Sequence, residues 1–358
     1  MKRFLPFMII MLFILTIIVG CGILEDTYEV ALITVYDMLD DSSFNHEVWE
    51  GLKKYAEDHN KSYQYYQPDE RTKASYLETI DLAVKKGAKL IVAPGSLFEV
   101  TIYEAQLKYP EVNFILIDGE PHTEDYKTYH TEENVLPILY AEEEAGFMAG
   151  YAAVMDGFTK LGFQGGMAVP EVIRYGHGFA QGAEIAAKEM GLAEGSVSLM
   201  YNYSGDSADS KESQERAAGW YQEGTEVIFV CGGSVESSVI AAAEAIEGKY
   251  VICVDAVQHA KSETVISSAV KMVSNSVYQV LEAYYDNKWE GGKTLLLNTA
   301  NGGVGLDMKN SRWRRFNYEN YNILLNAIKD KKYSINRKTD IGVNQLGLKY
   351  VSITEVKD

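Results

Sequence analysis

Two aspartates each stand directly after a short apolar run of residues. Asp118 follows the run 113–117, and Asp255 follows the run 250–254. An ionised carboxylate accepts hydrogen bonds from two hydroxyl groups, which suits a ligand that carries a vicinal diol. Asp at such a position also caps turns, so a structural role stays open for both residues. We predict that both aspartates bind a ligand.

An aromatic ring and an amide stand side by side in a polar segment. Phe44 follows two aspartates and two serines, and Asn45 comes directly after it. The Phe44 ring suits stacking on a planar base, although it would also pack on the protein surface. The Asn45 amide offers donors and an acceptor to the edge of a base, and it equally suits the cap of the next helix. Both are predicted ligand-binding residues.

Small residues follow two further apolar runs. Ser96 comes soon after the run 90–93, and Gly232 and Gly233 follow the run 227–231. Glycine lets a backbone approach a ligand closely, although a plain turn would need it as well. No Gly-Lys-Ser/Thr follows, so a phosphate loop is not indicated. We predict that these three small residues also contribute to the ligand-binding site.

Lys271 is the basic candidate, because it follows a short apolar run. It is placed to pair with Asp255, to meet the ligand or to lie in solvent. His177 and His259 have no companion motif, and no Cys/His cluster has the spacing of a metal site. We therefore predict a binding protein with no catalytic residue, no metal and no cofactor.

Strand-like and helix-like segments alternate along the chain and would position these side chains. The apolar run 30–35 is followed by Trp49, Leu52 and Tyr55 at helical spacing, and the alternation starts again near 135. Such alternation predicts an α/β fold of two Rossmann-like lobes with parallel sheets, in which ligands bind beyond the carboxyl ends of the strands. We expect lobe one at 28–138 plus 260–290, and lobe two at 139–259 plus 291–358.

The N-terminus has the pattern of a secretory signal. Lys2 and Arg3 precede an apolar run, 5–19, that is short for a transmembrane helix of about 20 residues. The run ends at Gly20-Cys21 and resembles a lipobox, in which Cys21 receives a diacylglycerol. Residues 1–20 are therefore predicted to be a lipoprotein signal peptide, with an uncleaved anchor helix as the alternative. Both place the rest of the chain outside the cytoplasmic membrane.

Composition narrows the classes of partner. The formal charge is −18, and removal of Lys2 and Arg3 with the signal peptide makes it −20. Such acidity argues against nucleic acid and against attraction of anionic substrates by the overall field. Cys231 and Cys253 both lie in apolar runs, which favours two buried thiols over a disulfide.

The ordered series of segments resembles the basic membrane protein family. These substrate-binding lipoproteins include purine nucleoside receptors of spirochaetes and Gram-positive bacteria. The resemblance runs from about residue 29 to about residue 306. The segments that carry it are 40–45 with 49–52, 86–92 with Gly95, 109–118, 143–150, 165–182, 231–234, 254–255 and 268–271.

The resemblance implies a type I periplasmic-binding-protein fold and a function in transport. It implies a lipid-anchored protein on the extracytoplasmic face of the cell membrane that captures a purine nucleoside for the permease and ATPase of an ABC importer. Two positions depart from the family pattern. Val35 stands where the family has an aspartate, with Asp37 out of register, and Gly205 stands where it has a second stacking aromatic, with Tyr203 two residues away.

Two other functions remain open from the residues alone. A ligand-sensing lipoprotein that signals without transport would have the same binding residues. An enzyme on the same scaffold would need a nucleophile with a base, or a metal cluster, at the strand ends. The aspartates, glycines and Phe44 found there favour binding over catalysis.

The lipid anchor is testable by substitution of Cys21. The Cys21→Ala variant should move to the soluble fraction wherever the signal is still cleaved, because no thiol remains to carry the diacylglycerol. Mass spectrometry of the wild-type N-terminus should find modified Cys21 as the first residue. An unmodified chain that starts at Met1 would refute the prediction.

Overall fold

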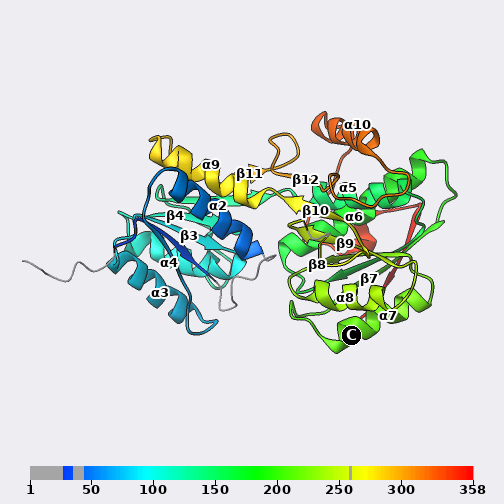
Figure 1. Cartoon of the computed structure of the whole chain (residues 1–358), viewed down its shortest axis with the longest axis horizontal. Coiled ribbons are helices and arrows are strands. Elements are labelled where there is room, and N and C mark those ends of the chain that lie inside the picture. Colours follow the sequence, from blue (N-terminus) through cyan, green and yellow to red (C-terminus); the bar gives the residue numbers. More distant parts are fainter. Residues whose placement is uncertain (1–26, 35–43, 258–259, 358) are drawn as a thin grey trace, which may run out of the picture.

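The computed structural model describes residues 27–34, 44–257 and 260–357. The expected Cys21 anchor, the signal peptide and Val35 with Asp37 lie outside these residues. The described chain forms two lobes that lie next to each other along the long axis of the molecule (Figure 1). Each lobe has its own sheet with helices on both faces, as the strand–helix alternation predicts.

Lobe one is built on a six-stranded sheet in the order β11-β5-β4-β3-β1-β2. All of its strand pairs are parallel. Parallel strands that are covered on both faces read as continuous apolar runs, and Val30–Ile33 is buried along its whole length. The strands are β1 (Val30–Ile33), β2 (Tyr63–Tyr66), β3 (Leu90–Pro94), β4 (Asn113–Ile117), β5 (Val135–Tyr140) and β11 (Leu295–Leu297).

Two pairs of helices cover this sheet. Val30 and Leu32 of β1 pack in one core with α2, whereas Ala31 and Ile33 pack in another with α3 and α4. Successive side chains of a strand point to opposite faces, so the two helix pairs lie on opposite sides. Helix α9 lies beside α2 although it comes much later in the chain (Figure 1). The helices are α2 (Phe44–Asp58), α3 (Lys73–Lys85), α4 (Glu99–Lys108) and α9 (Val273–Tyr285), with the 3-10 turn η1 (Ser96–Phe98) before α4.

Lobe two repeats this plan on a seven-stranded sheet in the order β12-β10-β9-β8-β6-β7-β13. Only β12 runs antiparallel to its neighbour, β10. The cysteines of β8 and β9 are buried free thiols, as predicted. The strands are β6 (Lys160–Gly165), β7 (Val197–Tyr203), β8 (Val227–Cys231), β9 (Tyr250–Asp255), β10 (Val265–Lys271), β12 (Val304–Leu306) and β13 (Val351–Glu355).

The helices of lobe two also lie on both faces of its sheet. Phe163 and Phe229 pack with α5 and α6, whereas Ile228 and Val230 pack with α7 and α8. The helices are α5 (Glu142–Met155), α6 (Pro170–Glu189), α7 (Lys211–Gln222), α8 (Val235–Glu244) and α10 (Tyr318–Lys329), with the 3-10 turn η2 (Val343–Leu346). Within the described residues, no helix combines the length and apolar character needed to cross a membrane.

The sheets correct the lobe boundaries expected at 138/139, 259/260 and 290/291. Strand β10 was expected in lobe one, but it pairs with β9 in the second sheet. Strand β11 was expected in lobe two, but it pairs with β5 in the first. The edge strands were misassigned because an apolar run does not reveal which of two sheets it will join.

The chain therefore crosses between the lobes three times. The crossings lie between β5 and α5, between β10 and α9, and between β11 and β12. Backbone hydrogen bonds tie them together: Ala141 N donates to Leu297 O at 2.8 Å, and Met272 N donates to Gly303 O at 2.9 Å. The Thr299 N–H also donates to Glu144 Oε2 at 2.7 Å. The three crossings thus form one hydrogen-bonded hinge.

Helices α5 and α6 pack backbone against backbone. An added Cβ at Gly150 would lie 2.0 Å from Phe179 O, and one at Gly182 would lie 1.9 Å from Phe147 O. Real Cβ atoms do not approach other atoms this closely, so neither site admits a side chain. Gly146 and Gly150 are four residues apart and share a helix face, as do Gly178 and Gly182.

Substitution of Gly150 tests this close packing. Gly150→Ala should lower the free energy of unfolding by about 3 kcal/mol, since an overpacked helix contact forces the backbones apart. Gly219→Ala on α7 is the matched control, because an added Cβ there meets no atom within 4 Å. The control should be neutral or stabilising by up to about 1 kcal/mol through helix propensity. Equal urea midpoints for the two variants would contradict the packing argument.

Candidate functional site

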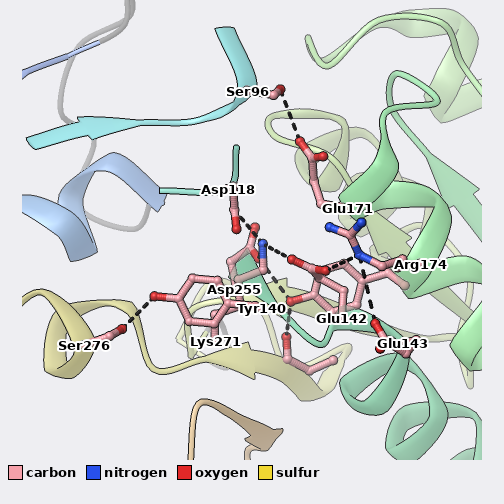
Figure 2. A network of polar contacts seen from close by, with 12 residues as sticks. Ser96, Asp118, Tyr140, Glu142, Glu143, Glu171, Arg174, Asp255, Lys271 and Ser276 are labelled. Atoms are coloured by element: carbon pink, nitrogen blue, oxygen red, sulfur yellow. Dashed lines mark hydrogen bonds and ion pairs between the residues drawn. The ribbon is translucent and has the colours of Figure 1, made fainter. Parts of the chain in front are cut away.

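Lys271 gathers three carboxylates at the junction of the lobes (Figure 2). Its ammonium lies 2.6 Å from Asp118 Oδ2, 3.0 Å from Glu142 Oε1 and 3.7 Å from Asp255 Oδ1. We call these four residues the Lys271 cluster. Asp118 follows β4 of the first sheet, whereas Lys271 and Asp255 end β10 and β9 of the second. The cluster therefore joins both lobes at the carboxyl ends of their strands.

Asp118 and Asp255 occupy equivalent places in the two lobes. Each comes at the end of the fourth strand of a sheet ordered 2-1-3-4-5, namely β4 and β9. Each also has a left-handed backbone, with φ of 59° and 61°. Non-glycine residues rarely adopt this conformation, and Asp is one that tolerates it. The turn aims both carboxylates at the same ammonium.

Burial and pairing together set the protonation of the cluster. Burial opposes the charge of Lys271, but Asp118, Glu142 and Asp255 outweigh it and raise its pKa well above the ordinary value. Burial raises the pKa of Asp118 to about 6 against the opposing charge of Lys271. Burial also raises the pKa of Asp255. For Glu142 the effect of burial is exceeded by Lys271 and Arg174, so its pKa is lowered.

Two further side chains hold the cluster from lobe two. Arg174 Nε of α6 lies 2.6 Å from Glu142 Oε2. The Tyr175 hydroxyl donates to Asp255 Oδ1 at 3.1 Å. Asp118 differs, since Lys271 occupies Oδ2 while Oδ1 is buried and accepts no hydrogen bond from the described part of the chain. Glu142 Oε1 likewise accepts no hydrogen bond there, although it lies 3.0 Å from the Lys271 ammonium. Asp118 Oδ1 therefore remains available to a ligand.

Phe44 forms an aromatic border of the cluster. Its ring centroid lies 5.4 Å from the Lys271 ammonium, within the range of a cation–π contact. The Tyr140 and Tyr175 rings lie at similar distances, 5.3 and 5.6 Å. Phe44 is partly buried at the first position of α2. The structure thus brings Phe44, Asp118, Asp255 and Lys271 together, as their positions after strands predict.

The other predicted residues lie at neighbouring strand ends. Asn45 is in the first turn of α2. Ser96 is the first residue of η1, and its hydroxyl donates a hydrogen bond to Glu171 Oε1 of the other lobe at 3.5 Å (Figure 2). Gly232 and Gly233 follow β8 with φ of 118° and 79°. An added Cβ at Gly232 would lie 2.8 Å from Gly166 N, so this turn needs glycine for its own packing.

The sequence of this chain matches a known family over most of its length. Residues 28–346 match the family described as ABC transporter substrate-binding protein PnrA-like. The chain belongs to this family. The match confirms the expected family, and PnrA-like proteins are substrate-binding components of ABC transporters.

Relatives with assigned names support the same family. The chain is 26% identical to the ABC transporter nucleoside-binding protein BmpA of Lactococcus lactis, over 87% of this chain and 92% of that protein. It is 27% identical to basic membrane protein B of Borreliella burgdorferi, over 81% of this chain and 84% of the relative.

Solved structures confirm the type I periplasmic-binding-protein fold of this PnrA-like chain. An ABC transporter solute-binding protein from Aeropyrum pernix has a TM-score of 0.66 at 22% identity, covering 86% of this chain and 87% of that one. A transcriptional activator of the comK gene from Bacillus halodurans has a TM-score of 0.68 at 18% identity, covering 86% and 100%. At these identities the likeness concerns the fold alone.

The PnrA-like site contains residues that the sequence reading did not select. Glu142 is a member of the Lys271 cluster, Arg174 and Tyr175 contact the cluster directly, and Glu171 accepts a hydrogen bond from Ser96. All four follow strands, Glu142 after β5 and the others on α6 after β6. Their places after strands therefore mark the right part of the chain, but the sequence does not separate Glu142 from its neighbours Glu143 and Glu144.

One proposed substitute residue has a structural partner. Tyr203 is the aromatic nearest in sequence to Gly205, which stands where the family has its second stacking ring, and is a candidate to substitute for that ring. Its hydroxyl lies 2.7 Å from the Tyr201 hydroxyl, and its ring packs edge-on against Phe163. Tyr203 thus packs at the edge of the lobe-two core, and stacking of this ring on a ligand stays a prediction.

The raised pKa of Asp118 predicts a pH-dependent stability. The folded state holds the Asp118 proton more tightly than the unfolded state, so its contribution to stability is full at low pH and is lost as pH rises through about 6. Asp118→Asn removes this titration. The unfolding free energy of the variant minus that of wild type should rise by about 2 kcal/mol from pH 4.5 to pH 7.5.

Urea unfolding at several pH values measures this difference in unfolding free energy. Asp125→Asn is the control, because a hydrogen bond from Thr123 lowers the pKa of this exposed carboxyl and should give no gain of that sign. If the difference in unfolding free energy between Asp118→Asn and wild type does not change with pH, burial does not disfavour the charged carboxylate.

Proposed function

We propose that this chain is the lipid-anchored substrate-binding protein of an ABC importer and that it captures purine nucleosides on the extracytoplasmic face. The observation that carries the proposal is the convergence of Phe44, Asp118 and Asp255 on Lys271 from both lobes. An aromatic face beside two carboxylate acceptors suits a ligand with a planar base and a diol. The nucleoside-binding relative from Lactococcus lactis supports this ligand class.

The charge of the site favours a neutral ligand. The Lys271 cluster holds three carboxylates and one ammonium, with Arg174 behind Glu142 as a second cation. A phosphate group would therefore meet carboxylates whose only ammonium is already paired. Hydroxyl groups and ring N–H groups donate hydrogen bonds to carboxylates without adding charge. A nucleoside fits this site better than a nucleotide.

Capture would involve binding without a chemical step. The lobes are joined by three hydrogen-bonded crossings, a plan that allows hinge closure around a ligand. A ligand that contacts Asp118 and Asp255 at once stabilises the closed arrangement, because it bridges the two sheets. The permease would then distinguish the loaded form from the empty form by the relation of the lobes, while the lipid on Cys21 keeps the protein near it.

The Phe44 ring provides the sharpest test of the ligand class. Calorimetry should show binding of inosine, guanosine or adenosine to wild type, and binding at least about 100-fold weaker for the 5′-monophosphate. Phe44→Ala should weaken the nucleoside about tenfold, through lost stacking and burial, and should change binding of free ribose much less.

Tyr126→Ala is the matched control, since this exposed ring stacks on His122 and is not among the rings that lie over the Lys271 ammonium in the described chain. It should leave nucleoside affinity unchanged. Wild-type protein that binds no nucleoside would refute the ligand assignment, and the departures at Val35 and Gly205 would then be the first positions to examine. Equal losses for nucleoside and ribose in Phe44→Ala would refute the stacking role.

A further inference from the structure

Glu142 differs from the other two carboxylates that pair with Lys271. The side chain of Asp255 is 25% exposed, whereas that of Glu142 is fully buried. Asp118 and Asp255 come at strand ends, and Asp118 keeps a free acceptor oxygen. Glu142 Oε1 also accepts no hydrogen bond from the described residues, but Glu142 has a cation near each oxygen, with Lys271 3.0 Å from Oε1 and Arg174 2.6 Å from Oε2. It is therefore placed to hold Lys271 and not to receive a ligand.

The position of this pair in the chain connects it to the hinge. Glu142 is the first residue of α5, directly after the first crossing, and Lys271 is the last residue of β10, directly before the second. The Tyr140 and Ser276 hydroxyl oxygens, 2.6 Å apart, join the same two crossings from the lobe-one side. The Lys271–Glu142 pair thus links the two crossings from lobe two.

We propose that Glu142 is a positioning residue for ligand capture, which holds the Lys271 ammonium in place when ligand hydroxyl groups engage Asp118 and Asp255. This inference rests on the proposed function and extends it to a residue that does not touch the ligand. The physical reason is that a buried ammonium without a carboxylate partner is strongly unfavourable. Without Glu142, the two aspartates would have to stay on Lys271, and the ligand would have to compete with that pairing.

Substitution of Glu142 should therefore weaken binding and move its pH dependence. At pH 8, Glu142→Gln should bind inosine, guanosine or adenosine at least about tenfold more weakly than wild type. Binding should also fall as Asp118 is protonated, near pH 6 in wild type. Loss of the Glu142 charge lowers the pKa of Asp118, so this fall should move to lower pH in the variant. In the described chain, the other groups that face Asp118 are Lys271, Asp255, Glu171 and Tyr140.

Two variants of the same helix turn act as controls. Glu144→Gln also removes the charge of a carboxylate from the first turn of α5, but Glu144 accepts from Thr299 N and is not among the carboxylates that pair with Lys271 in the described chain. Glutamine keeps an amide oxygen that accepts the Thr299 N–H of the hinge, so this variant should change affinity less than about threefold. Glu142→Asp keeps the charge on a shorter side chain and should restore much of the affinity and the wild-type pH midpoint. If Glu142→Gln acted only by removing a negative charge from the start of α5, Glu144→Gln would weaken binding to the same extent.

The outcomes separate this inference from the proposed function. If wild type binds a nucleoside and Glu142→Gln binds it as tightly with the same pH midpoint, the positioning role is overturned and the function stands. If Glu142→Gln does not fold, Glu142→Gln with Arg174→Gln removes both members of the buried pair, and normal binding by that protein would equally overturn the inference.

A ligand-free measurement decides the remaining case. If wild type binds no nucleoside, the proposed function fails, and NMR of the Lys271 ammonium in the free protein tests the positioning alone. An ordered ammonium that exchanges slowly with water should be visible in wild type and in Glu144→Gln, and lost in Glu142→Gln. A signal of equal intensity in all three proteins would overturn the inference without reference to any ligand.

Discussion

The pairing of one buried ammonium with three carboxylates is the interaction on which the rest of the site depends. Lys271 is buried, and its charge persists because Asp118, Glu142 and Asp255 surround it. Burial makes ionisation of Asp118 unfavourable, and the neighbouring carboxylates add to this effect, so its pKa is raised to about 6 despite the charge of Lys271. A cluster of this kind is only partly satisfied by its own members, and ligand hydroxyl groups that donate to the aspartates would relieve it. The buried carboxylates therefore both lower the stability of the folded chain and attract a ligand that donates hydrogen bonds.

The duplicated plan of the sheets explains how the cluster is assembled. Both sheets begin with the order 2-1-3-4-5, so the residues that end β4 and β9 occupy matching positions. Asp118 and Asp255 stand at these positions with the same left-handed backbone. The residues that end the fifth strands, Tyr140 and Lys271, match in the same way but differ in chemistry. One lobe supplies the ammonium, and the other supplies the ring that packs near it.

Sequence reasoning identified the strand-end aspartates but not their surroundings. Asp118 and Asp255 were predictable because an apolar run ending in a carboxylate marks the carboxyl end of a buried strand. Glu142 was not, because in sequence it is one of three consecutive glutamates, Glu142 to Glu144, at a helix start. Their different contacts arise from helix geometry: Glu142 faces Lys271 and Arg174, whereas Glu144 faces the third crossing. The packing of α5 against α6, β10 and the third crossing separates these roles.

The sequence by itself determined the α/β alternation, the two lobes, the family and the strand-end candidates, because each depends on local order along the chain. Tertiary structure alone decided which sheet takes β10 and β11, since an edge strand pairs with whichever sheet the crossings bring near. It also decided that Lys271 is buried among three acids and not solvated. Asp118 and Glu142 lie more than a hundred residues from Lys271, so their distances from its ammonium are set only when the chain has folded and, for Asp118, when the two lobes have met.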